Sequence, residues 1–177
     1  VQKRRGSTLK GVITISLMAV NVVFWVPILL VVALAKLLIP LAAWRRWTSA
    51  LMIWIAQAWI SCNGAIFSLM GALRLEVDGV EGLDPRSWYL VLSNHQSWVD
   101  ILVLQKAFNR RIPFLKFFLK QQLIWVPLLG LAWWALDFPF MKRHSATYLQ
   151  KHPQARGEDL DATRKACERF ALLPTSV

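Results

Sequence analysis

His95 and Asp100 stand five positions apart, directly after a short apolar run at residues 88–92. On a continuous strand or helix this spacing would not face the two side chains toward each other, but a bend between a strand and a following helix can bring them together. A paired imidazole and carboxylate can remove the proton of a hydroxyl group, with the carboxylate fixing the imidazole tautomer. The spacing therefore predicts a general-base pair that needs no serine or cysteine nucleophile.

The alternative for this pair is structural. A histidine at the end of a strand can hydrogen-bond a nearby aspartate to satisfy a half-buried turn, and for an arbitrary pair at this spacing that role is the commoner one. The charge of the segment after the pair is a separate observation. Asp137 is the only acid between residues 101 and 157, so we expect an electropositive region there. Five of the bases there could instead form a solvated, lipid-facing surface: Lys106, Arg110, Arg111, Lys116 and Lys142.

Three segments resemble the glycerol-phosphate and lysophosphatidic acid acyltransferases. Residues 94–100 match the H-x-x-x-x-D signature of that family, including the asparagine that often precedes the histidine. Residues 120–130 match its block of Lys, apolar, Pro and Gly residues, and residues 140–143 match its second motif. The resemblance covers about residues 74–143 in the right order, and details beside the first motif look like a bacterial membrane-bound subgroup.

The resemblance implies a 1-acylglycerol-3-phosphate O-acyltransferase-like enzyme. It would move a fatty acyl group from a thioester of coenzyme A or acyl carrier protein to a hydroxyl of a lysophospholipid. His95 would be the base and Asp100 its orienting carboxylate. Arg143 and Lys120 would hold the phosphate of the acceptor, because arginine binds phosphate bidentately and lysine adds a point charge. Asn94 would also contact the substrate. No metal or other cofactor is expected.

Two features depart from the family pattern. Asp137 stands six positions before Arg143, where many relatives have glycine, so the backbone geometry there is open. The third motif, a Glu-Gly-Thr-Arg-like phosphate clamp, is expected shortly after residues 175–177, and the chain ends first. We therefore expect a fragment without that motif, for which inactivity in isolation is an alternative. A non-catalytic membrane module of the same fold is the other.

The composition indicates a membrane. The hydrophobic fraction of 56% exceeds the roughly 45–50% of soluble domains, and ten tryptophans accompany it. A net charge of +11 fits nucleic acid, an anionic membrane or acidic substrates. Because the bases flank long apolar stretches rich in tryptophan, membrane lipids are favoured as partners and nucleic acid is not expected. The two cysteines lack metal-ligand spacing, so neither a zinc site nor a disulfide framework is predicted.

Residues 1–73 are predicted to anchor the chain in a membrane through helices. Residues 12–35 are almost uninterrupted apolar sequence, long enough to span at about 20 residues per crossing, and Pro40 should end that helix. A second run at residues 50–73 has polar interruptions, so a spanning helix and a helix packed on the first are both open. We expect the inner (cytoplasmic) membrane, with the catalytic domain facing the cytoplasm.

Residues 74–177 are predicted to form an acyltransferase domain of the α/β class, incomplete at its C-terminus. Its mixed sheet would be flanked by helices and carried by the membrane-embedded helix pair. The expected strands are residues 74–79, 88–92, 112–115 and 138–141, the second of them buried. The expected helices are residues 101–108, 116–125 and 157–172, the first of them buried.

Overall fold

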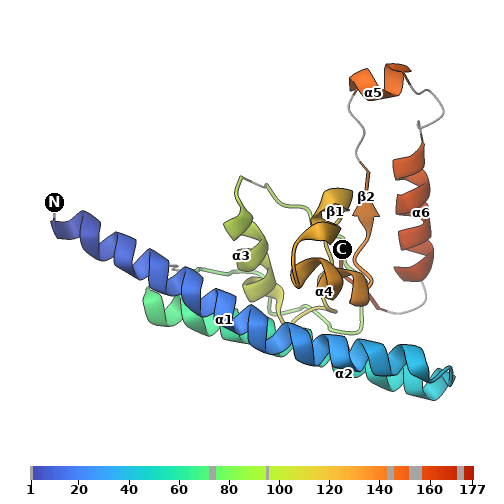
Figure 1. The fold of residues 1–177 in the computed structure, drawn as a ribbon, viewed down its shortest axis with the longest axis horizontal. Coiled ribbons are helices and arrows are strands. Elements are labelled where there is room, and N and C mark those ends of the chain that lie inside the picture. The colour runs from blue at the N-terminus through green and yellow to red at the C-terminus, as the bar shows by residue number, and fades with distance from the viewer. Residues whose placement is uncertain (1, 72–74, 95, 143–145, 152–156, 171–173) are drawn as a thin grey trace.

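Two long helices joined by a short turn form the N-terminal part of the fold (Figure 1). The computed structural model describes residues 2–71, 75–94, 96–142, 146–151, 157–170 and 174–177. Helix α1 spans Gln2–Leu38 and helix α2 spans Ala42–Met70, so both predicted apolar helices are confirmed. Helix α1 ends before Pro40, which has no N–H to continue the helical hydrogen bonds. The two helices run antiparallel, and we call the pair the hairpin.

Helix α2 packs against α1, as one alternative for the second apolar run predicted, and this packing does not exclude a spanning helix. The side chain of Asn21 donates from Nδ2 to Oδ1 of Asn63 at 2.9 Å and to the backbone oxygen of Trp59 at 3.2 Å. The polar interruption at Asn63 is therefore a contact between the two helices. The apolar side chains of the hairpin that are exposed by 3% or less are Val26, Leu29, Met52, Ile55 and Ala56.

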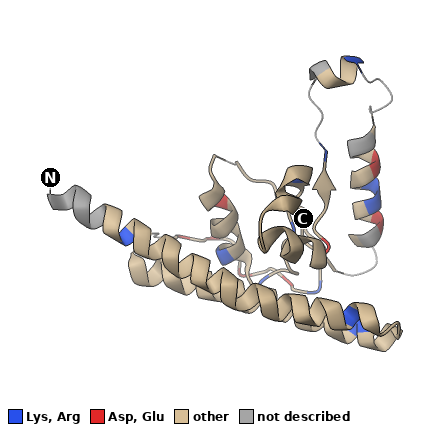
Figure 2. Cartoon of the chain, in the orientation of Figure 1, with Lys and Arg blue, Asp and Glu red and all other residues tan. Residues whose placement is uncertain are grey.

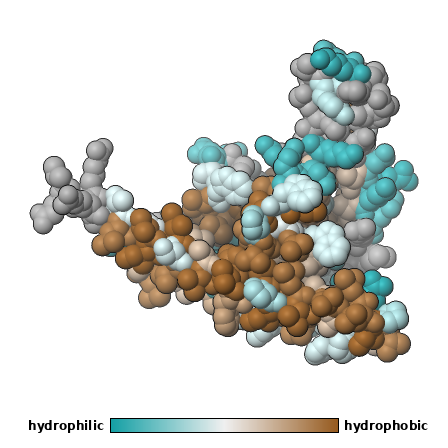
Figure 3. All heavy atoms as spheres, viewed as in Figure 1, coloured by the Kyte–Doolittle hydropathy of each residue, from teal (hydrophilic) through white to brown (hydrophobic). Residues whose placement is uncertain are grey.

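The hairpin presents an exposed apolar surface along most of its length (Figure 3). Within the described residues, both helices are long and apolar enough to cross a membrane, yet only 17% and 39% of their most apolar 18-residue segments are buried. Charge is confined to the ends of α1, with no charged residue between residues 11 and 35 (Figure 2). An apolar surface of this extent marks contact with lipid or another protein, so the hairpin is compatible with membrane association.

The rest of the chain folds over one side of the hairpin (Figure 1). Helix α3 (Trp98–Phe108) contacts α2, and helix α4 (Leu129–Ala135) contacts α1. One cluster of buried apolar residues connects the hairpin with the segments after it. Its members from beyond the hairpin are Phe114, Leu119, Ala132, Leu136 and Phe138. Because this core runs along the hairpin, α1 and α2 are part of the fold and not a tail attached to it.

Polar contacts hold α3 on the hairpin. Lys106 donates from Nζ to Oγ of Ser68 at 2.8 Å and to the backbone oxygen of Gly64 at 3.3 Å. Asn109 donates from Nδ2 to Oγ of Ser61 at 2.9 Å. The interpretation of Lys106 as a solvated surface base is therefore wrong. The helix itself was predicted to be buried, but its residues are half-buried or exposed, because only the face toward α2 is covered.

The sheet is parallel and small, which corrects the predicted mixed sheet. Strand β1 (Leu119–Lys120) pairs in parallel with strand β2 (Phe140–Met141), which lies inside the predicted strand 138–141. Isolated parallel bridges join Ser176 to Tyr89 on one side and to Leu115 on the other. Within the described residues these pairings are all parallel, and most of the regular structure is helical.

Two predicted strands differ from the prediction, one in its pairing and the other in its burial. Residues 75–79, the described part of the first, form no strand, although Leu75 and Val77 are partly covered and their neighbours are exposed. Residues 88–92 bond to residues 175–177 through Tyr89 and Val91, and they are not buried. Every second side chain of that run is largely exposed, from 57% to 84% at Trp88, Leu90 and Leu92, although the indole N–H of Trp88 donates to the backbone oxygen of Phe170 at 2.8 Å.

The predicted helix at residues 116–125 is also corrected. The N–H of Leu119 donates to the backbone oxygen of Pro139 at 2.9 Å, so this part of the chain joins β2 as strand β1. A 3-10 helix, η1 (Gln121–Trp125), follows, and residues 112–115 contribute a bridge at Leu115 in place of a full strand. Helix α6 (Glu158–Phe170) confirms the last predicted helix, and the short α5 (Ala146–Lys151) was not predicted.

Candidate active site

The parallel pairings direct three predicted motif segments to one edge of the sheet. The run through Tyr89 leads into Asn94, β1 ends at Lys120, and β2 ends at Met141, inside the second motif. In open parallel sheets, ligands bind at the edge formed by the carboxyl ends of the strands. His95 and Arg143 lie outside the described residues, so the roles assigned to them stay predictions.

Asp100 lies at the start of α3, held by the backbone that leads into the helix. Its Oδ2 accepts hydrogen bonds from the N–H groups of Gln96 at 2.6 Å and Ser97 at 2.7 Å. Ser97 is the N-cap with φ −152° and ψ 164°, so the chain stays extended through it and becomes helical at Trp98. A carboxylate on the third helical residue that folds back to the N-cap N–H is the arrangement of a capping box.

This arrangement gives Asp100 a structural role and a position suited to chemistry at once. A negative charge is favourable at a helix N-terminus, and two N–H groups fix the carboxylate in place. The carboxylate also contacts the two residues that directly follow position 95. The predicted change from extended chain to helix between residues 94 and 100 is therefore present, while the pairing with His95 remains a proposal.

A cleft of about 490 Å³ opens beside the first motif. Trp98 from the motif and Ser93 just before it line the cleft together with Lys120, and the other walls are apolar. Those apolar residues are Ile101, Leu104, Phe117, Phe118, Leu119 and Leu123. Pockets of several hundred Å³ with apolar walls and few polar groups are typical of small-molecule sites. A cleft with one cation and otherwise mostly apolar walls suits an amphiphile that carries a negative charge.

The cleft brings together some of the predicted site residues and adds others. Lys120 is exposed and lines the cleft, whereas Asn94 is exposed beside it and does not line it. Trp98 and Phe117 were not predicted as cleft residues. The position of Trp98 inside the first motif was a usable signal, but Phe117 lies in a segment that was predicted to be helical and is not. Two other tryptophans of this region, Trp125 and Trp134, do not line this cleft.

Asp137 has a left-handed backbone, with φ 59°. This positive φ explains why many relatives have glycine at this position. Glycine adopts positive φ without steric cost, while a side chain costs about 1–2 kcal/mol there. Aspartate is among the few other residues that tolerate this region. The replacement therefore preserves a turn between α4 and β2.

We expect Asp137→Gly to be about 1 kcal/mol more stable than Asp137→Ala, since both remove the carboxylate but only alanine keeps a Cβ at positive φ. Equilibrium unfolding of the two variants in the same detergent measures the difference. Equal stability of the glycine and alanine variants would contradict this account of the turn.

The profile of the acyltransferase family matches residues 74–168, more than half of the 177-residue chain. The chain therefore belongs to this family, and the glycerol-phosphate and lysophosphatidic acid acyltransferases predicted from the motifs are confirmed as its relatives. The bacterial subgroup stays a prediction.

Among curated proteins, the chain is similar to the 1-acyl-sn-glycerol-3-phosphate acyltransferases alpha of Mus musculus, Homo sapiens and Bos taurus. Each is 35% identical over 72 residues, which are 40% of this chain and 24% of the relative. The matched part thus spans about a quarter of the length of these relatives. No solved structure matches.

Proposed function

We propose that this protein transfers a fatty acyl group from an acyl thioester to the free hydroxyl of a lysophospholipid, with 1-acylglycerol-3-phosphate as the acceptor. The observation that carries the proposal is the cleft that joins the first motif to Lys120 at the carboxyl edge of the sheet. Its apolar walls suit the acyl chains of both substrates, and the lysine suits the phosphate. Membership of the acyltransferase family supports the reaction class.

In the proposed reaction, His95 removes the proton of the acceptor hydroxyl as its oxygen attacks the thioester carbonyl. The tetrahedral intermediate then expels the thiolate of coenzyme A or acyl carrier protein, which takes the proton from the imidazolium. An ester forms, a thioester breaks, and no metal or redox cofactor takes part. Asp100 would orient the imidazole and stabilise its charged form, and the N–H groups of Gln96 and Ser97 keep that carboxylate in place.

The acceptor phosphate would be held by Lys120 and Arg143, with Asn94 as a neutral hydrogen-bonding neighbour. Lys120 ends β1, and the second motif begins with β2, so the paired strands support a shared phosphate site. The guanidinium supplies two parallel donors and the ammonium a point charge. A donor headgroup with several phosphates would also be attracted to this electropositive region.

An acyl-transfer assay of the full-length protein in membranes tests the function. We expect label from an acyl thioester to appear in phosphatidic acid when lysophosphatidic acid is supplied, and much less product with lysophosphatidylcholine or glycerol 3-phosphate. Lys120→Gln should raise KM for lysophosphatidic acid about tenfold, since a charged hydrogen bond is worth about 1.5–3 kcal/mol. Lys151→Gln, an equal charge change on α5, should leave KM unchanged. Failure of transfer with every donor and acceptor would favour a non-catalytic module.

We further propose that the hairpin lies along one face of a membrane and does not cross it. The domain packs along the hairpin, from the hydrogen bond of Lys106 on α3 to Ser68 on α2 as far as the core residue Phe138, so a hairpin perpendicular to the bilayer would pull the domain into the hydrocarbon. The exposed apolar side chains of α1 and α2 would enter one leaflet, as in interfacial helices.

Thiol labelling distinguishes the two arrangements. In sealed vesicles, an impermeant reagent should reach a cysteine at the turn (Ile39→Cys, with Cys62→Ser and Cys167→Ser) from the same side as the native, exposed Cys167 on α6. Labelling of the two positions from opposite sides would mean two crossings, and protection of the turn from both sides would mean a hairpin dipping into the hydrocarbon. Either result would refute an interfacial hairpin.

A further inference from the structure

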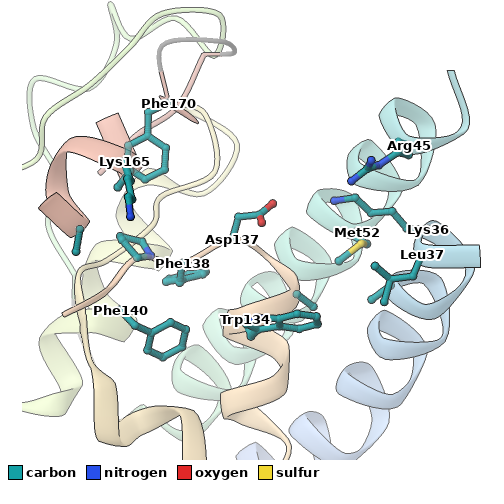
Figure 4. Close-up of a pocket in the computed structure, with 15 residues that line it drawn as sticks. Lys36, Leu37, Arg45, Met52, Trp134, Asp137, Phe138, Phe140, Lys165 and Phe170 are labelled. Atoms are coloured by element: carbon teal, nitrogen blue, oxygen red, sulfur yellow. The ribbon is translucent and has the colours of Figure 1, made fainter. Parts of the chain in front are cut away.

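A second cleft, of about 480 Å³, lies between the turn of the hairpin and α6 (Figure 4). It shares no lining residue with the cleft beside the first motif. The second cleft opens beside residues 137–140, where the chain enters β2, and so lies at the end of the strand opposite to the predicted motif edge. The proposed reaction uses none of its residues.

Three cations line this second cleft. Lys36 comes from the last turn of α1, Arg45 from the start of α2 and Lys165 from α6. Lys36 and Arg45 lie close together on one wall, Lys165 is on the other, and Asp137 lies between them (Figure 4). None of the three cations makes an ion pair or hydrogen bond with its side chain in the part of the chain that the structure describes. Asp137 is the one acid among the lining residues, so two positive charges remain uncompensated.

The walls between these charges are apolar. They include Leu37, Trp134 and Phe140, and Leu37 and Trp134 are 63% and 54% exposed. The same exposed apolar surface continues onto the hairpin turn, where Leu38 and Leu41 are 72% and 66% exposed. A free inorganic anion would pair with the cations and leave this apolar surface in water. A ligand with an anionic headgroup and acyl chains would cover both.

We propose that the second cleft binds the headgroup of an anionic glycerophospholipid from the surrounding membrane. The phosphate lies among Lys36, Arg45 and Lys165, and the acyl chains run past Leu37 and Trp134 toward the apolar face of the hairpin. The site rests on the proposed membrane attachment and is independent of acyl transfer. Because Lys165 belongs to α6 and the other two cations to the hairpin, the bound lipid would tie α6 to the membrane surface.

Thermal unfolding of the detergent-solubilised full-length protein tests the site, since a ligand that binds the folded state raises the midpoint in a saturable way. The probes are dihexanoyl phosphatidylglycerol, dihexanoyl phosphatidylcholine and inorganic phosphate at equal concentrations. We expect a rise with phosphatidylglycerol alone. In Lys36→Gln/Lys165→Gln the same rise should require roughly 30-fold more phosphatidylglycerol, since two of three basic contacts are lost.

The matched control is Lys10→Gln/Arg164→Gln, which also removes one cation from α1 and one from α6 but changes no residue of the cleft. It should respond like the unaltered protein, and so should the motif variant Asp100→Asn, whether or not the protein transfers acyl groups. Lys165→Gln alone, at an exposed position, provides a milder variant if the double one does not fold. Equal responses of the cleft and control variants, or an equal rise with inorganic phosphate or phosphatidylcholine, would overturn the proposal.

Discussion

Replacing His95 with alanine is expected to lower the rate of acyl transfer by about 10² to 10⁴-fold in the full-length protein, the range attributed to general-base help. The alcohol of the acceptor is a weak nucleophile until its proton is removed, and no serine or cysteine nucleophile is proposed to replace that step. The loss should fall on kcat, because the phosphate and the acyl chains would still be bound by other groups. Single-turnover measurement with labelled acyl thioester separates kcat from KM.

Two further variants test whether the loss of activity is specific to His95 and to the charge of its proposed partner. His152→Ala makes the same chemical change at a histidine with no acid five positions after it and should keep activity. Asp100→Asn keeps a side-chain oxygen that can accept the N–H groups of Gln96 and Ser97 but loses the charge that would stabilise the imidazolium. It should therefore lose activity with little change in unfolding midpoint. Turnover of His95→Ala at the rate of the unaltered protein would refute the assignment of the base.

Gly130→Ala is expected to destabilise the fold by more than about 3 kcal/mol, beyond the usual cost of overpacking. A Cβ at this position would lie 2.5 Å from the carbonyl carbon of Ile124 and closer still to its oxygen. These are backbone atoms of η1, so they cannot rotate away as a side chain would. Relief of the contact would separate η1 from α4 and strain the bond from the Gly130 N–H to the backbone oxygen of Val126, now 2.8 Å.

Gly11→Ala is the matched control for this prediction. Gly11 lies in α1 with no atom near its added Cβ, so alanine there should be neutral or stabilise the helix by up to about 1 kcal/mol. Unfolding midpoints and yields of the two alanine variants in the same detergent give the comparison. If both variants unfold like the unaltered protein, the close approach of η1 to α4 is wrong.

The structure gives a physical reason for parts of the family resemblance. The glycine of the block at residues 120–130 is required by the approach of Ile124, and the aspartate at position 137 replaces glycine at a left-handed residue. Both requirements come from the backbone and not from the reaction. They keep η1, α4 and β2 in a fixed relation, and Lys120 lies at the start of that unit.

Local features of the sequence were enough to predict the two apolar helices, the end of α1 before Pro40, and the extended-to-helix junction that carries Asp100. Each depends on interactions within a few residues: an apolar run of fixed length, a proline without an N–H, or a carboxylate that caps its own helix. The sequence alone could not show that residues 119–120 join β2, because that depends on a hydrogen bond from Leu119 to Pro139. Nor could it show that Lys106 binds α2 or that Lys36 and Lys165 line one cleft. Those contacts join residues far apart in the chain, and they exist only once the core of the hairpin and the domain has formed.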